Sequence, residues 1–253
     1  DNPAQRLWVL YAADGQYLIG NFDGRRFTVL PGASARKHRL WHGNFYAAQS
    51  YSNAPDGRRI QVGWGQGIEF PGMPFNQQMT VPCRLTLRTI GEETTDGPPI
   101  RLFAEPVKEL ETLRKEGSKR AWSDLTLSAG DPNPLKDLSG DLFDILATVE
   151  IPSGQASPLE FNLRGIPLTY DPAARELRIN NIKAPLAPED DVIKLRLLLD
   201  RGSVEIFGND GRVAISAAIA PDLANTSLGV RSTGTGTPAK LKSLEVYEMN
   251  SAW

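Results

Sequence analysis

Short apolar runs separated by Asp-Gly pairs set the fold class of this chain. The runs at residues 7–11, 17–20 and 45–51 are followed by Asp14-Gly15, Asp23-Gly24 and Asp56-Gly57. Asp-Gly between apolar runs is a strong hairpin signal, because both turn residues tolerate positive φ angles. Strands spaced this closely, with no helical period between them, predict an all-β domain of successive hairpins.

One helical segment divides the chain into two β regions. Residues 106–115 (PVKELETLRK) place Val107, Leu110 and Leu113 at i, i+3 and i+6, and Gly117 ends the segment. Strands at 84–89 and 100–104, separated by the polar turn 91–99, precede it. We expect β-strands over residues 1–105, a linker helix over 106–117 and a β-sandwich over 118–253. About eight strands in the last region, the longest over 141–151, fit two sheets.

The charge balance and hydropathy exclude two classes of partner. Across 253 residues, 28 Lys and Arg face 30 Asp and Glu, so the net charge is −2 and no run favours nucleic acid. No apolar stretch approaches the roughly 20 residues needed to cross a membrane. Residues 1–3 do not resemble a signal peptide, although a processed or truncated chain would lack one too. We expect neither a nucleic-acid nor a membrane partner.

Cysteine and histidine usage predicts neither a disulfide nor a metal site. Cys83 is the only cysteine, so no intrachain disulfide is possible. His38 and His42 are four residues apart, a spacing that binds metal when it lies on a helix, but they stand just before a predicted strand. Residues 209–211 (Asn-Asp-Gly) are typical of a turn, and the acidic run 189–191 of a solvated surface. We expect no metal and no cofactor.

Six segments, in the correct order along the chain, resemble the invertase and levanase family, glycoside hydrolase family 32. They are residues 17–27 (YLIGNFDGRRF), 45–50 with 58–64 (FYAAQS, RRIQVGW), 72–87 (GMPFNQQMTVPCRLTL), 105–114 (EPVKELETLR), 195–213 (LRLLLDRGSVEIFGNDGRV) and 244–253. Members of this family join a five-bladed β-propeller to a β-sandwich. The resemblance therefore implies about the last two propeller blades, a linker helix and the sandwich.

The resemblance also implies a retaining β-fructosidase that acts on levan, inulin or sucrose. Such chemistry uses an Asp nucleophile and a Glu acid/base roughly 5 Å apart. The family's WMNDPNG, RDP and EC motifs do not occur here. Asp131-Pro132-Asn133 matches three residues of the first but lies beyond the linker, Cys83 follows a proline, and Glu69 departs from the catalytic positions. We expect the C-terminal part of such an enzyme, without catalytic residues and inactive alone.

Five residues are candidates for contact with sugar. Tyr46, Trp64 and Gln49 match family positions around the fructose pocket, where aromatic rings pack against the sugar. Asn76 and Gln78 carry amides, which both donate to and accept from hydroxyl groups. The alternatives are that Trp64 is a core residue and that the amides bond to nearby backbone.

A partial propeller would expose apolar surface and strand edges. We therefore expect, besides a fructan or sucrose-like carbohydrate, either the missing N-terminal propeller half or self-association as partner. A non-catalytic carbohydrate-binding or structural module is the alternative function, and a fragment without an independent role is a third. By analogy with fructan-degrading enzymes the protein would be secreted or periplasmic.

Overall fold

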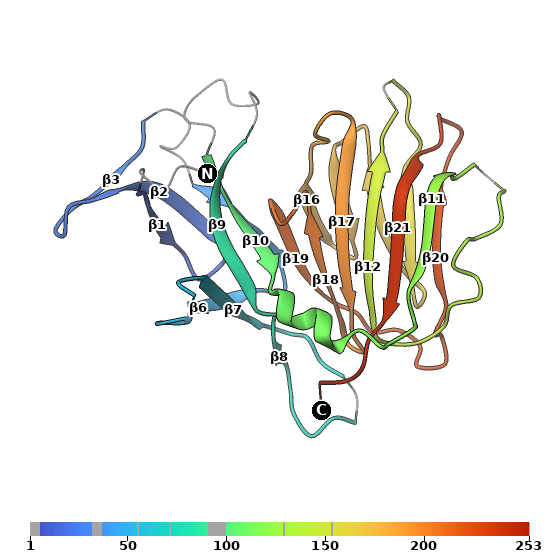
Figure 1. The fold of residues 1–253 in the computed structure, drawn as a ribbon, viewed down its shortest axis with the longest axis horizontal. Coiled ribbons are helices and arrows are strands. Elements are labelled where there is room, and N and C mark those ends of the chain that lie inside the picture. Colours follow the sequence, from blue (N-terminus) through green and yellow to red (C-terminus); the bar gives the residue numbers. More distant parts are fainter. Residues whose placement is uncertain are drawn as a thin grey trace.

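A computed structural model describes residues 6–31, 37–54, 56–70, 72–90, 100–128, 130–152 and 154–252. Over these ranges the chain is almost entirely β-strand, which confirms the predicted all-β class. The strands form two blades beside a two-sheet sandwich (Figure 1). The turn predicted at 91–99 lies outside the described residues. No helix in the described ranges is long and apolar enough to cross a membrane.

The first blade is built on the predicted Asp-Gly turns. Its strands are β1 (Trp8–Tyr11), β2 (Gln16–Phe22), β3 (Phe27–Val29) and β4 (His38–Arg39), and β2 pairs with the other three. Gly15 has a φ of 82°, and Asp14 accepts the Gln16 N–H through Oδ1 at 3.2 Å. The turn is therefore stabilised by contacts between neighbouring residues.

The second blade has the strand order β10-β9-β7-β6. These strands are β10 (Ile100–Pro106), β9 (Cys83–Thr89), β7 (Arg59–Gly65) and β6 (Tyr46–Ser50). A short strand, β8 (Gln78–Met79), pairs with the end of β7. The antiparallel pair of β9 and β10 confirms the two strands predicted over 84–89 and 100–104.

The sandwich consists of a seven-stranded and a five-stranded sheet. The larger has the order β11 (Arg120–Thr126), β21 (Lys240–Glu248), β12 (Phe143–Glu150), β17 (Val192–Leu199), β18 (Ser203–Gly208), β19 (Val213–Ala218) and β5 (Trp41–Gly43). The smaller has the order β16 (Ile182–Pro185), β15 (Glu176–Ile179), β14 (Ile166–Asp171), β13 (Leu159–Leu163) and β20 (Leu228–Ser232).

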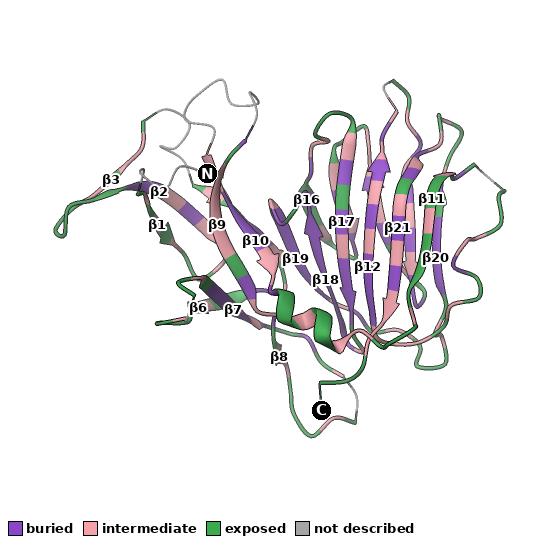
Figure 2. Ribbon diagram, viewed as in Figure 1, coloured by how far each residue is buried: buried purple, intermediate pink, exposed green. Residues whose placement is uncertain are grey.

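Alternate side chains of these strands fill the sandwich core. Phe143, Ile145, Ala147 and Val149 of β12 are at most 3% exposed and pack between the sheets. The same alternation runs along β17 from Val192 to Leu197, as the purple bands in Figure 2 show, and the strand ends in three consecutive buried leucines, Leu197 to Leu199. Period-2 burial of this kind is what the sequence over 141–151 predicts.

The structure agrees with the turn predicted at 209–211 and with the solvated surface predicted at 189–191. Asn209, Asp210 and Gly211 all have positive φ (46°, 55° and 85°) and connect β18 to β19. The acidic run 189–191 is exposed and precedes β17. Neither arrangement gathers ligands around a cation.

The linker helix is shorter than predicted and of a different type. It is a six-residue 3₁₀ helix, η2 (Lys108–Leu113), instead of a helix over 106–117. The i, i+3, i+6 spacing of Val107, Leu110 and Leu113 fits this, because a 3₁₀ helix has three residues per turn. Val107 is 7% exposed, and its N–H donates to the Pro82 carbonyl at 3.0 Å.

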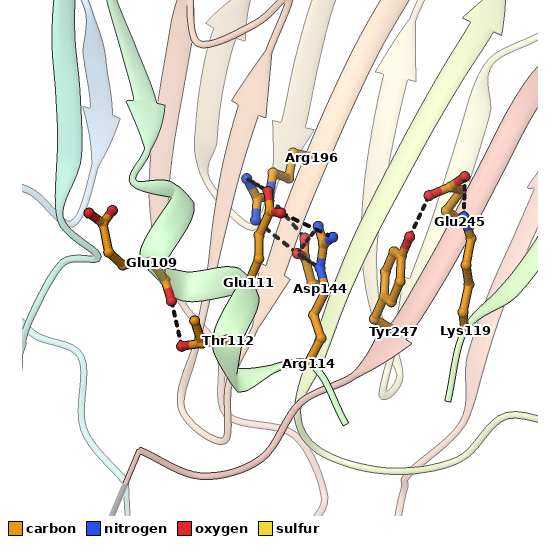
Figure 3. A network of polar contacts seen from close by, with 9 residues as sticks. All are labelled: Glu109, Glu111, Thr112, Arg114, Lys119, Asp144, Arg196, Glu245 and Tyr247. Atoms are coloured by element: carbon orange, nitrogen blue, oxygen red, sulfur yellow. Dashed lines mark hydrogen bonds and ion pairs between the residues drawn. The ribbon is translucent and has the colours of Figure 1, made fainter. Parts of the chain in front are cut away.

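A buried carboxylate fastens the end of the linker to the sandwich (Figure 3). Asp144 of β12 is fully buried and accepts four hydrogen bonds. Two come from Arg114, at 2.9 and 2.7 Å, and two from Arg196 of β17, at 3.0 and 2.8 Å. The Arg114 guanidinium also lies 4.0 Å from the centroid of the Tyr247 ring. One carboxylate therefore joins three segments.

Replacing Asp144 with alanine should therefore destabilise the protein strongly. The change leaves Arg114 and Arg196, whose side chains are 18% and 16% exposed, without their shared partner. Urea unfolding should show a loss of about 3–5 kcal/mol. The control is Asp141→Ala, which breaks the more exposed pair with Arg201 and should cost below about 1 kcal/mol. Equal losses in both variants would contradict the role assigned to Asp144.

Candidate functional site

The blades and the sandwich share one apolar cluster. It contains Tyr17, Ile19, Leu40, Trp41, Phe45, Cys83, Leu102, Ala104, Leu198, Phe207 and Ala214, all at most 8% exposed. Trp41 stacks on Phe45 with 4.4 Å between ring centroids and meets Phe207 edge-on at 5.9 Å. This cluster holds both blades against the face of β17, β18 and β19 that points away from the sandwich core.

Three strands of the second blade place a row of large apolar side chains on one face. Tyr46 of β6 is the register partner of Trp64 in β7, and Trp64 is the partner of Met79 in β8. Directly opposed residues share a face of a sheet. Tyr46 is 46% exposed and Met79 55%, while Trp64 is half-buried. We call Tyr46, Trp64 and Met79 the aromatic strip; Trp64 is not a fully buried core residue.

A β-bulge in β6 determines where Gln49 lies. Tyr46 and Gln49 are three residues apart, yet their partners Trp64 and Val62 are two apart, and Ala47 adopts a left-handed φ of 49°. In a regular strand residues three apart point to opposite faces. The extra residue therefore puts Gln49 on the face of Tyr46. Gln49 also borders a cavity of about 480 Å³ against β1.

The three loop amides have different surroundings. Asn76 is exposed, whereas Gln77 accepts the Gly67 N–H at 2.9 Å and so bonds to the backbone of its own loop. Gln78 lies over Gly65 and donates from Nε2 to Ser203 Oγ of β18 at 2.9 Å. Because Gln78 and Met79 are consecutive in a strand, the Gln78 side chain points away from the aromatic strip.

A buried carboxyl group that sequence reasoning missed lies behind this loop. Glu205 of β18 is 2% exposed; its Oε1 accepts the Val81 N–H at 2.7 Å and its Oε2 accepts Ser216 Oγ–H at 3.2 Å. Ser216 Oγ in turn accepts Trp41 Nε1–H at 2.9 Å. Burial raises the pKa of Glu205 to about 8, and the charge of Asp200 adds to this. The sequence held one sign of this buried group: Glu205 stands between the apolar residues Val204 and Ile206 in a predicted strand.

The carboxylates considered for catalysis do not lie on the aromatic strip. Strands β6, β7 and β8 carry no Asp or Glu. Glu69 is exposed, and Asp131 accepts the Ser128 N–H at 2.8 Å in a turn of the sandwich region.

The histidines belong to different sheets, His38 to β4 of the first blade and His42 to β5 of the sandwich. Burial lowers the pKa of His42 to about 4, with a smaller contribution from Arg39. Within the described ranges, no three His, Cys, Asp or Glu side chains are grouped to hold a metal ion.

The buried Glu205 should make stability depend on pH with a definite sign. Its pKa is raised from 4.5 to about 8, so the native state keeps a proton that the unfolded chain loses. The resulting stability is present below pH 4.5 and lost as the pH rises through 8, at about 1.4 kcal/mol per pH unit inside that window. Unfolding in urea at several pH values, for the unsubstituted chain and Glu205→Gln, should show this in their difference.

Subtracting the free energy of unfolding of Glu205→Gln from that of the unsubstituted chain cancels the contributions of the other titrating groups. His42, with its pKa lowered from 6.5 to about 4, gives the opposite slope between those values in both proteins. The Cys83 thiol has its pKa raised well above 9, beyond the window. Glu160→Gln, at a partly exposed pair with Arg231, is the control and should retain the pH dependence of the unsubstituted chain. A pH-independent difference for Glu205→Gln would refute the assignment.

Two family profiles together match most of the chain. The profile of "Glycosyl hydrolases family 32 N-terminal domain" matches residues 9–98, and that of "Glycosyl hydrolases family 32 C terminal" matches residues 109–248. A levanase of Bacillus subtilis is 31% identical over 292 residues, covering 100% of this chain and 41% of the levanase. The chain spans less than half the length of the relatives it matches.

Solved structures share the fold. The exo-inulinase from Aspergillus awamori superposes with a TM-score of 0.77 at 23% identity, covering 100% of this chain and 55% of that one. A fructofuranosidase from Schwanniomyces occidentalis, complexed with fructosylnystose, gives 0.79 at 18% identity, covering 99% and 58%. These likenesses confirm two propeller blades joined to a β-sandwich.

Proposed function

Because the chain belongs to glycosyl hydrolase family 32, we propose that it is the C-terminal part of a retaining β-fructosidase acting on levan, inulin or sucrose. The observation that carries this proposal is the aromatic strip of Tyr46, Trp64 and Met79 on an open face of the second blade. The names of the relatives, levanase and exo-inulinase, support the choice of a fructan.

The strip has the chemistry of a sugar-binding surface. Aromatic rings pack against the apolar C–H face of a sugar, and amides pair with its hydroxyl groups. Gln49 shares the face of Tyr46 through the bulge, and Asn76 is exposed in the adjoining loop. We assign the sugar contacts to Tyr46, Trp64, Gln49 and Asn76, and give Gln78 an anchoring role.

The nucleophile and the acid/base are proposed to come from outside these residues. A retaining mechanism needs two carboxyl groups about 5 Å apart, flanking the sugar carbon that is attacked. The strands of the strip contain none. This chain then supplies the walls that orient the fructosyl unit, while another part of the propeller supplies proton transfer and nucleophilic attack.

The first blade offers a surface for that other part. Trp8 and Leu10 of β1 are 55% and 56% exposed, and Phe22 of β2 is 39% exposed. Large apolar side chains gathered on a blade face are normally covered. We propose that further propeller blades cover them, with a second copy of this chain as the alternative. Since relatives include extracellular enzymes, we propose that the protein acts outside the cytoplasm.

A non-catalytic carbohydrate-binding role is the second candidate, favoured by the same lack of carboxylates on the strip. Measurable affinity for fructan without turnover, unchanged when the N-terminal half of a family member is added, would identify it. Turnover that appears on that addition would identify the enzyme instead.

The 253-residue chain alone should release no fructose from levan, inulin or sucrose. Released fructose is measured after incubation of the purified chain with each substrate, next to Glu69→Gln and Asp131→Asn. These two variants test the carboxylates at positions 69 and 131, which the family pattern does not use. Release that disappears in either variant would show a rebuilt active site and contradict the proposal.

Trp64→Ala should weaken binding of 1-kestose by about tenfold, since a stacked aromatic contributes roughly 1.4 kcal/mol. Tyr46→Ala should act in the same direction. Calorimetric titration of the chain gives both affinities. The matched control is Trp8→Ala, which removes an exposed tryptophan from the other blade. An equal loss in Trp8→Ala, or none in Trp64→Ala, would remove the aromatic strip as the binding surface.

A further inference from the structure

The segment that carries Met79 into the aromatic strip is bonded to the second blade along its length. We call residues 78–82 the β8 segment. Gln78 and Met79 pair with β7; the Thr80 N–H donates to the Gly63 carbonyl at 2.8 Å, and the Gly63 N–H donates to Thr80 Oγ1 at 2.9 Å. These bonds pair the segment with β7 over Gln78 to Thr80, whereas the Val81 N–H is bonded to Glu205 of the sandwich.

The sandwich is hydrogen-bonded to the same segment through two buried polar side chains. Ser203 and Glu205 are two residues apart in β18 and so point to the same face, toward the blades. Ser203 Oγ accepts the Gln78 amide at 2.9 Å, and Glu205 Oε1 accepts the Val81 N–H at 2.7 Å. Both residues are 2% exposed. Val204 and Ile206, which alternate with them along β18, pack into the sandwich core instead.

Burying a hydroxyl and a carboxyl group is unfavourable unless their hydrogen bonds are made. Both bonds exist only while the β8 segment holds its observed place, so any displacement leaves buried polar atoms unsatisfied. Glu205 is itself fixed from behind by Ser216, which is bonded to Trp41 of the shared apolar cluster. Ser203 and Glu205 of the sandwich therefore hold the β8 segment in a defined position.

We propose that Ser203 and Glu205 are positioning residues for sugar binding, acting through Gln78 and Val81 to hold Met79 beside Trp64. The proposal rests on the proposed function of the aromatic strip. The sandwich then contributes to the sugar site indirectly. It makes no contact with the sugar, but it determines the position of Met79 in the aromatic strip.

The test combines hydrogen exchange with titration of 1-kestose into the 253-residue chain. Ser203→Ala and Glu205→Leu each remove one bond to the β8 segment. Amide exchange at Met79 and Val81 should become about fivefold faster, and affinity for 1-kestose about fivefold weaker, as expected for one lost hydrogen bond. Glu205→Gln keeps an acceptor oxygen for the Val81 N–H and should retain the affinity.

Ser232→Ala is the matched control, because Ser232 is a buried serine of β20 that accepts the Ala239 N–H at 3.0 Å. Ser232→Ala should change neither the amide exchange rates at Met79 and Val81 nor the affinity for 1-kestose. Unchanged exchange at residues 79 and 81 in both test variants, or faster exchange with unchanged affinity, would overturn the proposal. If the unsubstituted chain binds no 1-kestose while both variants exchange faster, the proposed function fails and the grip of the sandwich on the β8 segment stands.

Discussion

The parallel pairing of β5 with β19 is the contact on which the relation between the two halves depends. Trp41, His42 and Gly43 lie beside Ala214, Ile215 and Ser216, so a segment from the blade region completes a sandwich sheet. The Trp41 ring then enters the shared apolar cluster while its Nε1 donates to Ser216. Backbone pairing, apolar burial and one buried hydrogen bond thus act at the same place. The blades and the sandwich are therefore joined at this junction by three kinds of contact.

From that junction the polar contacts follow in order. Ser216 donates to Glu205, Glu205 accepts from Val81, and Val81 lies two residues after Met79, the last residue of β8. Each partner is buried or half-buried, so each bond is made in surroundings where its loss is costly. Tyr46 and Met79 of the aromatic strip are exposed, yet the chain on either side of Met79 is held by the buried side chains of Ser203 and Glu205.

The parts of the fold that depend on neighbouring residues were predictable from the sequence. The Asp-Gly turns and the alternation over 141–151 carry their structure locally, and both predictions are confirmed. The linker helix predicted over 106–117 lies in the right part of the chain, but the structure has only the six-residue 3₁₀ helix η2 (Lys108–Leu113), whose type follows from the three-residue spacing. The hairpin predicted around Asp56-Gly57 also forms, because β6 pairs antiparallel with β7.

The rest depends on contacts between residues far apart in sequence. Nothing local shows that Trp41 pairs with a strand more than 170 residues later, or that Gln78 turns toward Ser203. The bulge at Ala47 is invisible too, because alanine does not favour a positive φ and only the surrounding sheet imposes it. Glu205 carried a signal, an acid among apolar residues, whose meaning required knowing that both faces of β18 are covered.

The shared sheet also limits where the chain can be divided. A recombinant sandwich beginning at residue 118 would lack β5, and β19 would become an edge strand with unpaired backbone groups. Its residues, Val213 to Ala218, are small and apolar (VAISAA), without a charge or proline to block pairing with another molecule. The boundary suggested by the linker is thus a poor site for excision: a sandwich cut there would be prone to aggregate, whereas one that retains residues 41–43 keeps its edge covered.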